Sequence, residues 1–79
     1  VVPADELEAA TAQLARRLAG GPARAHAEIK ALVNRSFETP LPEQLDAEAA
    51  AFARCAATRD FNEGVNAFVA KRTAKFEGR

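Results

Sequence analysis

The sequence predicts an all-α fold of about four helices. Residues that favour helices, chiefly Ala, Leu, Glu, Gln, Arg and Lys, fill most positions of the chain. The few β-branched residues never alternate with polar ones over the length of a strand. Glycines and prolines gather at a few points, where they divide the 79 residues into segments of helical length.

The first helix is expected from about Ala4 to Ala19. Pro3 suits a helix start, acidic residues in the first turn and arginines in the last favour the two ends of the helix dipole, and Gly20-Gly21 end the helix. One face carries an apolar stripe made of Leu7, Thr11, Leu14 and Leu18. We expect this face to be buried.

The second helix is expected from about Pro22 to Phe37, since proline is tolerated in a first turn. Its apolar stripe consists of Ala25, Ile29, Leu32, Val33 and Phe37. The short Gly-Gly-Pro link before it allows either an antiparallel helical hairpin or a sharp corner. The sequence does not choose between the two.

A firm boundary follows at Thr39-Pro40-Leu41-Pro42, because each proline lacks an N–H donor and pushes its predecessor into extended conformation. The third helix is expected from Leu41 or Pro42 to Thr58, with a stripe of Leu41, Leu45, Ala49, Phe52 and Ala56. Its other sides carry the small residues Ala47, Ala50, Ala53 and Ala57. Neighbours can therefore approach closely on both sides, which makes this helix a candidate for the middle of an interface.

The fourth helix is expected to begin with Asp60 as N-cap and Glu63 three residues later, a pair that resembles a capping box. Gly64 in its first turn costs about 1 kcal/mol relative to alanine. A glycine at this point indicates either close packing against another backbone or simple tolerance.

The end of this helix is expected to present two rings and three cations on one face, because the residues are spaced at i, i+3, i+4, i+7 and i+8. They are Phe68, Lys71, Arg72, Lys75 and Phe76. The two lysines are like charges four residues apart, so an anionic partner would relieve their repulsion. Phosphate binds such ammonium groups, and a flat ring offers a stacking surface to a purine. The alternative is a solvated basic helix end with Phe68 in the core.

A chain of 79 residues forms at most one small domain, which buries only about 60% of its unfolded surface. A single cysteine excludes an internal disulfide, and no Cys or His pair has the spacing of metal ligands. Large apolar side chains are few, with no Trp, Tyr or Met. We expect a thin core that needs oligomerisation or a preceding domain for stability.

Eleven basic and eleven acidic residues cancel, which argues against general binding to nucleic acid or to an anionic membrane. No apolar run approaches the roughly 20 residues that span a bilayer, and no signal peptide is recognisable. With its alanine-rich composition, the chain is expected to be cytoplasmic and bacterial. The start Val1-Val2-Pro3 lacks an initiator methionine, so a fragment or a processed chain is expected.

Other conspicuous residues are assigned structural roles. His26 lies at the edge of an apolar stripe without a nucleophile at suitable spacing, so a packing or surface role is expected. Cys55 has no neighbouring histidine or cationic cluster and is expected to be a small buried residue. The carboxylates Glu43, Asp46, Glu48 and Glu63 are interpreted as capping and solvating groups.

Three motifs carry a family resemblance. The pattern L-x-x-A-x-x-L-A-x-G-P-x-x-A is matched from Leu7 to Ala25, with one extra residue in the helix, and K-x-x-x-N is matched by Lys30 and Asn34. The most specific, D-x-x-E-G-x-x-A-F-x-x-K-R-x-x-x-F, is matched by Asp60, Glu63, Gly64, Ala67, Phe68, Lys71, Arg72 and Phe76. Over essentially its whole length the chain resembles the C-terminal helices of the crotonase (enoyl-CoA hydratase/isomerase) superfamily.

The resemblance implies a single helical segment that follows a spiral ββα core, which these residues lack. Residues 1–21 would be the last core-type helix and link, and residues 22–79 the helices that drive oligomerisation, as a trimer or a dimer of trimers, and cap CoA. Phe68 and Lys71 fall on the positions that approach the adenine and phosphate end of CoA in such enzymes. Arg72 and Lys75 are weaker candidates.

The resemblance assigns no catalytic residue to this chain, because the family's acid/base glutamates and oxyanion-hole N–H groups lie in the spiral core. No cofactor or metal is expected, and an acyl-CoA would be the substrate of a parent enzyme, an enoyl-CoA hydratase (a lyase) or an isomerase. The 79 residues alone are expected to be inactive. The partners implied are copies of the chain and acyl-CoA, with neither nucleic acid nor membrane.

Two further functions are open. A free-standing helical interaction module would associate through the third helix without a ligand. A small nucleic-acid binder using residues 71–79 is disfavoured by the zero net charge. If the chain is isolated, another copy is expected to cover the stripes that contain Leu7, Leu14, Leu18, Ile29 and Phe37.

Overall fold

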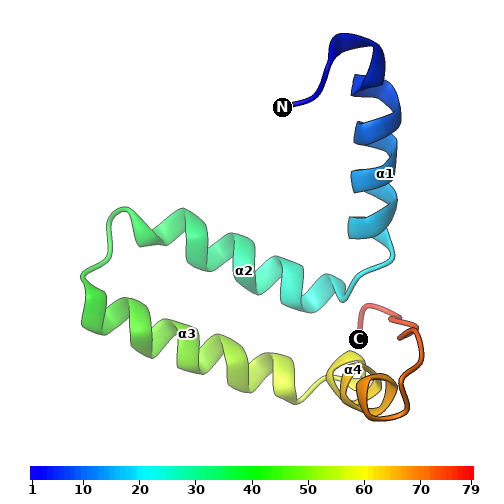
Figure 1. The fold of residues 1–79 in the computed structure, drawn as a ribbon. Coiled ribbons are helices and arrows are strands. Elements are labelled where there is room, and N and C mark those ends of the chain that lie inside the picture. Colours follow the sequence, from blue (N-terminus) through cyan, green and yellow to red (C-terminus); the bar gives the residue numbers. More distant parts are fainter.

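The computed structural model describes all 79 residues, and it contains four α-helices and no strand (Figure 1). A short 3₁₀ turn, Ala4–Glu6, leads into the first helix. The helices are α1 (Leu7–Ala19), α2 (Ala23–Ser36), α3 (Leu41–Ala56) and α4 (Arg59–Val69). Residues 70–79 follow α4 without regular structure. The predicted all-α class of four helices is therefore confirmed, and the boundaries of the first three agree with the expected ones within a few residues.

A sharp corner separates α1 from α2, which decides between the two geometries that the link allows (Figure 1). Gly20 closes α1 by donating its N–H to the carbonyl of Arg16 at 3.0 Å, and Gly21 donates to the carbonyl of Leu18 at 3.1 Å. A Cβ on Gly21 would collide with Cε1 of His26, whose ring lies over this glycine. A side chain at position 21 would therefore require the His26 ring to move, and His26 packs over the turn, one of the two roles expected for it.

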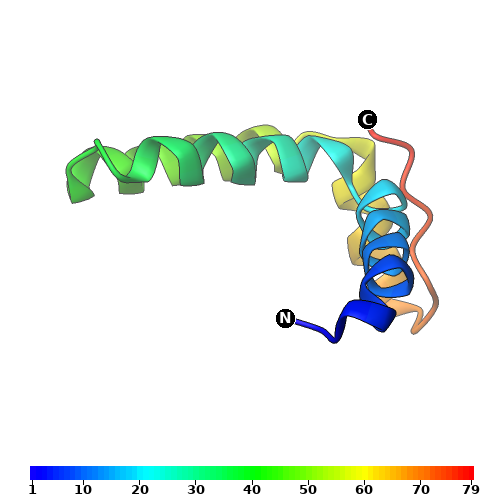
Figure 2. The ribbon, with the colours of Figure 1, turned by 90° about the horizontal axis from the view of Figure 1, so that it is seen from above.

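The helices α2 and α3 form an antiparallel hairpin and lie side by side in both ribbon views (Figures 1 and 2). Gln44 of α3 donates from Nε2 to the carbonyl of Leu32 at 3.1 Å. Arg54 binds both carboxylate oxygens of Glu28 at 2.7 Å. The small side chain of Ala51, two turns along α3 from Gln44, is only 2% exposed. One side of the alanine-rich helix therefore packs closely against α2, as small residues permit.

The fourth helix runs out of the plane of this hairpin. It is seen nearly end-on in Figure 1 and lengthwise in Figure 2. Its expected boundaries are wrong at both ends. Thr58 rather than Asp60 is the N-cap, and its hydroxyl accepts a hydrogen bond from the N–H of Phe61 at 3.1 Å. The helix ends at Val69, so it does not carry the face expected to reach Phe76.

The molecule has almost no core of its own. Four residues of 79 are buried, namely Ala51, Ala67, Gln44 and Asp60. The radius of gyration is 15.7 Å, against about 12 Å for a compact domain of this length. Half or more of each leucine of the α1 stripe is exposed. The expected thin core is confirmed, and the expected burial of the α1 stripe does not occur within this chain.

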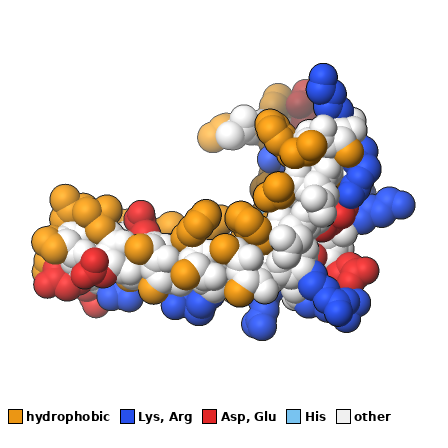
Figure 3. Space-filling model, turned by 90° about the horizontal axis from the view of Figure 1, so that it is seen from below, with side chains coloured by type: hydrophobic (Ala, Val, Ile, Leu, Met, Phe, Trp, Pro, Cys, Tyr) orange, Lys and Arg blue, Asp and Glu red, His pale blue; other side chains and the backbone are white.

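The exposed apolar side chains are not scattered. Figure 3 shows hydrophobic side chains gathered on the inner side of the bend between the long arm and the short arm, with charged side chains mainly on the outer side. The long arm is the hairpin α2–α3, and the short arm contains α1, α4 and the chain end (Figure 2). None of the helices combines the length and the apolar character that crossing a bilayer requires.

Candidate functional site at the end of the fourth helix

The residues expected to contact a ligand lie where α4 ends. Phe68 is in its last turn and is 85% exposed. Lys71 donates its N–H to the carbonyl of Phe68 at 3.2 Å, and Arg72 donates to the carbonyl of Ala67 at 3.0 Å. These two bonds are those of a Schellman motif, which satisfies the last carbonyls of a helix and reverses the chain. Phe68 and Lys71 are therefore neighbours across a turn, and do not share a helical face.

Lys71 has an unusual backbone conformation for a residue with a side chain. Its φ is +52°, and no other residue except a glycine has a positive φ. The left-handed region costs about 1 to 2 kcal/mol for an L residue, and glycine usually occupies this position of the motif. Such strain is concentrated at functional sites. A lysine at this position is thus a candidate for a role that glycine could not perform.

Glu63 holds the chain that follows the turn. Its two oxygens bind Nη1 and Nη2 of Arg72 at 2.7 and 2.9 Å, and Oε1 also accepts the backbone N–H of Lys75 at 2.8 Å. The hydrogen bond from Arg72, followed by that from the Lys75 backbone, lowers the pKa of Glu63 from 4.5 to about 2. The predicted capping role of Glu63 is wrong, because Thr58 caps the helix and Glu63 binds residues beyond its other end.

The predicted face of three cations is not formed, because the helix stops before all of them. Arg72 is engaged by Glu63, whereas neither Lys71 nor Lys75 takes part in any of the three ion pairs of the chain. Repulsion between two lysines one helical turn apart is therefore absent. The three cations differ in state, and Lys71 is the unpaired one that lies in the turn itself.

Asp60 fastens the last residues of the chain to the start of α4. It is 3% exposed, and its two oxygens accept the backbone N–H groups of Glu77 and Gly78, each at 2.8 Å. The N–H of Asp60 donates to the carbonyl of Arg79 at 2.8 Å. A buried carboxylate with two backbone donors is a strong structural anchor. Asp60 is therefore a clasp for the chain end and not an N-cap.

Phe76 packs against α4 at Gly64. Its Cε1 lies 3.6 Å from the place where a Cβ on Gly64 would stand, which is ordinary van der Waals contact. No backbone lies close to this glycine and a Cβ would have room against the ring, so Gly64 is tolerated here and the close approach of another backbone is not observed. The residues of the most specific sequence motif are together the parts of a fold-back in which residues 70–79 return along α4.

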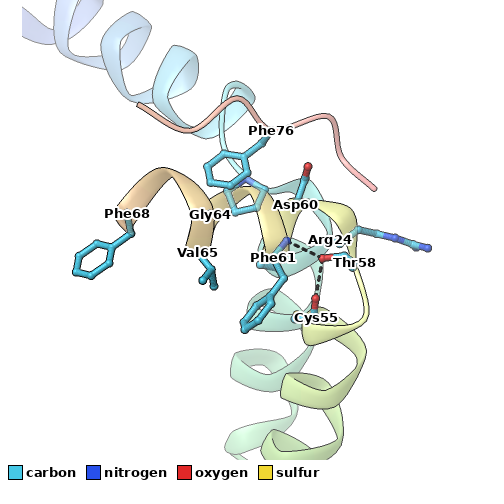
Figure 4. Close-up of a pocket in the computed structure, with 11 residues that line it drawn as sticks. Arg24, Cys55, Thr58, Asp60, Phe61, Gly64, Val65, Phe68 and Phe76 are labelled. Atoms are coloured by element: carbon cyan, nitrogen blue, oxygen red, sulfur yellow. Dashed lines mark hydrogen bonds between the residues drawn. The ribbon is translucent and has the colours of Figure 1, made fainter. Parts of the chain in front are cut away.

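A cleft of about 380 Å³ opens between α4 and the start of α2 (Figure 4). Its wall is mainly apolar, with Phe61, Val65 and Phe68 from α4 and Phe76 from the fold-back. Phe61 also makes an edge-to-face contact with Phe52 of α3, with ring centroids 6.0 Å apart. The polar groups at the cleft are largely occupied, since Thr58 donates to the carbonyl of Cys55 at 2.6 Å. Such a surface suits binding rather than acid/base chemistry.

Cys55 is half-buried beside this cleft, in keeping with the packing role expected for it. No group of three His, Cys, Asp or Glu side chains is placed to hold a metal ion.

The residues of the most specific motif lie near one another in the structure, but a chain reversal brings them together and not a shared helical face. Periodicity cannot reveal the contact between Glu63 and Arg72, which lie nine residues apart and meet only because the chain reverses at Lys71. The N-cap was detectable, since Thr58 is a favoured capping residue type two positions before the one chosen.

Comparison with known proteins gives consistent matches. A family model for enoyl-CoA hydratase/isomerase matches residues 1–79. Over 65 residues the chain is 42% identical to a probable enoyl-CoA hydratase of Rhodobacter capsulatus, in a match that covers 82% of this chain and 25% of the relative. Over 76 residues it is 41% identical to 1,2-epoxyphenylacetyl-CoA isomerase of Escherichia coli K12, covering 95% of this chain and 29% of the relative.

The same arrangement of helices occurs within longer solved structures. An enoyl-CoA hydratase/isomerase structure from Mycobacterium abscessus matches all of this chain with a TM-score of 0.91 at 40% identity, and 30% of that protein is covered. The chain spans between 25% and 31% of the length of the curated relatives it matches. The corner, the hairpin and the fold-back are thus part of a larger fold in these proteins.

Proposed function

The chain belongs to the enoyl-CoA hydratase/isomerase family, and on this premise we propose that it is the C-terminal segment of an enzyme that acts on acyl-CoA thioesters. In this proposal the segment joins subunits and contacts CoA, and the catalytic groups lie outside it. The observation that carries the proposal is the family match over every residue of a chain that spans less than a third of its relatives. The apolar side chains along the bend support it, because such a surface requires a partner.

The CoA contact is assigned to Phe68 and Lys71. The Phe68 ring is nearly free of protein contact and offers a face on which a purine can stack. The Lys71 ammonium is not engaged in an ion pair and stands three residues away, where it can meet a phosphate. Arg72 was a weaker candidate, and its bidentate pair with Glu63 supports leaving it outside the contact.

The parent reaction is proposed at the level of the substrate class. Relatives named as a hydratase and as an isomerase match with nearly equal identity, 42% and 41%. Both names refer to CoA thioesters, so the proposed parent chemistry is stabilisation of a thioester enolate by preorganised hydrogen-bond donors. We place these donors and the acid/base groups of the reaction outside the 79 residues. We therefore propose that the 79 residues by themselves bind and assemble without turning over substrate.

The CoA assignment is tested by the variants Lys71→Ala and Phe68→Ala in the full-length enzyme. Each is expected to raise the KM for an acyl-CoA thioester about tenfold, with kcat changed less than about twofold, since the loss of one phosphate or stacking contact worth about 1.4 kcal/mol is a tenfold loss of affinity. Both side chains are exposed, so the free energy of unfolding should hardly change. Lys30→Ala, an exposed lysine of α2, is the charge-matched control. Unchanged KM in both variants would remove the assigned contact.

The alternative, a free-standing helical interaction module, is favoured by one observation, the apolar side chains left uncovered on α1 and the hairpin. It predicts association of the 79-residue chain with no response to CoA. Analytical ultracentrifugation of the chain with and without CoA separates the two functions. A stable monomer at micromolar concentration would contradict the association that both functions include.

A further inference from the structure

The turn that presents Lys71 is held from both sides. On the side of α4, the N–H groups of Lys71 and Arg72 are bound to the carbonyls of Phe68 and Ala67. Beyond the turn, Glu63 binds the guanidinium of Arg72 and the backbone of Lys75. The Lys71 side chain is left out of these contacts, and of Lys75 only the backbone takes part. Its backbone is strained, so the surrounding contacts must maintain the conformation.

Glu63 also decides which cation of this region is available. Arg72 is adjacent to Lys71 in sequence and would be the better bidentate partner for a phosphate. Both of its terminal nitrogens are occupied by Glu63, at 2.7 and 2.9 Å. A single carboxylate therefore neutralises the competing cation and fixes the chain on the far side of the turn.

We propose that Glu63 is a positioning residue for CoA: by clasping Arg72 and the Lys75 backbone, it keeps the Lys71 turn in the conformation that directs the ammonium to the CoA phosphates. This inference rests on the proposed contact between Lys71 and CoA. Glu63 itself touches no ligand and acts through the residues on either side of the turn.

The sign of the effect distinguishes positioning from simple electrostatics. Glu63 is an anion close to a site for an anionic ligand, so its charge alone opposes phosphate binding. If charge were the whole effect, removing it would also release Arg72 and would strengthen CoA binding. If Glu63 acts by positioning, its removal weakens CoA binding, because the turn becomes mobile and the Lys71 ammonium is no longer directed to the phosphates.

The measurement is the Kd of CoA by isothermal titration calorimetry on the full-length enzyme, with Glu63→Ala and the isosteric Glu63→Gln. Glu63→Ala is expected to weaken binding about fivefold to tenfold, and Glu63→Gln by less, because the amide oxygen can still accept one of the hydrogen bonds. If Glu63→Ala does not fold, Glu63→Gln carries the test. Tighter binding in these variants, or unchanged binding, would overturn the proposal.

The chain offers a closely matched control in Glu28→Ala. Glu28 forms the same kind of bidentate pair, with Arg54, and its side chain has the same 25% exposure as that of Glu63. It joins α2 to α3 and contacts no residue of the turn. Glu28→Ala removes a bidentate pair of the same kind and is expected to leave the Kd of CoA unchanged. Equal losses of affinity in the two variants would mean a general structural effect and would overturn the proposal.

A double-mutant cycle separates this inference from the proposed function. If Glu63 acts through Lys71, the variant Glu63→Ala/Lys71→Ala should bind CoA as weakly as Lys71→Ala alone. If the losses of CoA affinity in the two single variants add up fully in the double variant, Glu63 does not act through Lys71. The inference would then be wrong, although the contact between Lys71 and CoA would stand. If Lys71→Ala alone binds CoA normally, the proposed contact fails, and the positioning role fails with it.

Discussion

The hairpin α2–α3 and the α4 fold-back each contain a bidentate Glu–Arg pair, but they are held together in different ways. In the hairpin, Glu28 and Arg54 join two regular helices that also meet through small side chains such as Ala51. In the fold-back, Glu63 and Asp60 bind backbone N–H groups of a segment that has no regular structure. Packing of regular surfaces orders the first region, and specific polar contacts order the second.

The difference shows which substitutions should destabilise each region. A helical interface is distributed over many weak contacts, so a single polar substitution changes it little. The irregular segment depends on a few acceptors, and removing one leaves backbone N–H groups without their protein partner. Four predictions follow the comparison from the largest expected effect to the smallest.

Asp60→Ala should break the fold-back and spare the hairpin. The substitution removes two charge-assisted hydrogen bonds and leaves the N–H groups of Glu77 and Gly78 without their acceptor, so a loss of about 2 to 4 kcal/mol is expected. Amide hydrogen exchange should show lost protection at these two residues and unchanged protection in α3. Glu77→Ala, which removes only the exposed pair with Arg79, should cost less than about 1 kcal/mol. Equal effects of the two would mean that Asp60 is not the anchor.

Ala51→Leu is the reciprocal change, expected to disturb the hairpin and leave the fold-back ordered. Ala51 is 2% exposed, so three added carbons would force the two helices apart, at a cost of about 1 to 3 kcal/mol. Urea unfolding followed by circular dichroism measures the loss. Ala50→Leu, the same change at an exposed position of the same helix, should be nearly neutral. A stability of Ala51→Leu equal to that of Ala50→Leu would contradict the close approach of α2 and α3.

Acid should weaken the hydrogen bonds by which Glu63 holds the fold-back. The pKa of Glu63 is lowered from 4.5 to about 2 by the hydrogen bonds of Arg72 and of the Lys75 backbone. The ion pair between Glu63 and Arg72 therefore contributes stability that is fully present above pH 4.5. This stability is lost as the pH falls from 4.5 through about 2. Carbon-detected NMR titration of the Glu63 carboxyl should give the low midpoint, and the Lys75 amide should shift with it.

The comparison is sharpened by Glu28, whose pKa is also lowered by its hydrogen bond to Arg54. Glu28 binds no backbone N–H, so its titration should leave the amides of the hairpin unmoved. In Glu63→Gln the Lys75 amide should lose its acid transition. A Glu63 midpoint near 4.5 would mean that the pair with Arg72 does not persist in solution.

Lys71→Gly should give the smallest change in stability of the four, and this change should be a stabilisation. Glycine adopts a φ of +52° without the steric strain of a side chain, so the variant should be about 1 kcal/mol more stable than Lys71→Ala, which keeps that strain. Both variants lack the ammonium and should bind CoA equally weakly. Thermal unfolding and calorimetry measure the two quantities. A Lys71→Gly variant no more stable than Lys71→Ala would show that the left-handed turn is not maintained in solution.

Most of the helical arrangement was predictable, and the end of the chain was not. The corner at Gly20-Gly21 and the break at Thr39 to Pro42 stop helices for local reasons, and the structure places the helix ends close to both. The end of α4 has no such local signal. Ala70, Lys71 and Arg72 all favour helix, so propensity extends the helix through the point at which the chain turns back.

The sequence by itself determined the number of helices, the apolar stripes, the family resemblance and the importance of the residues between Asp60 and Phe76. These properties depend on composition and on contacts within one or two turns, which local order along the chain encodes. Only the tertiary structure decided that α1 and α2 meet at a corner, that Asp60 and Glu63 clasp the chain end, and that Lys71 lies in a left-handed turn. Such features arise when one carboxylate meets donors up to 18 residues away, a pairing that depends on position in space and not on periodicity.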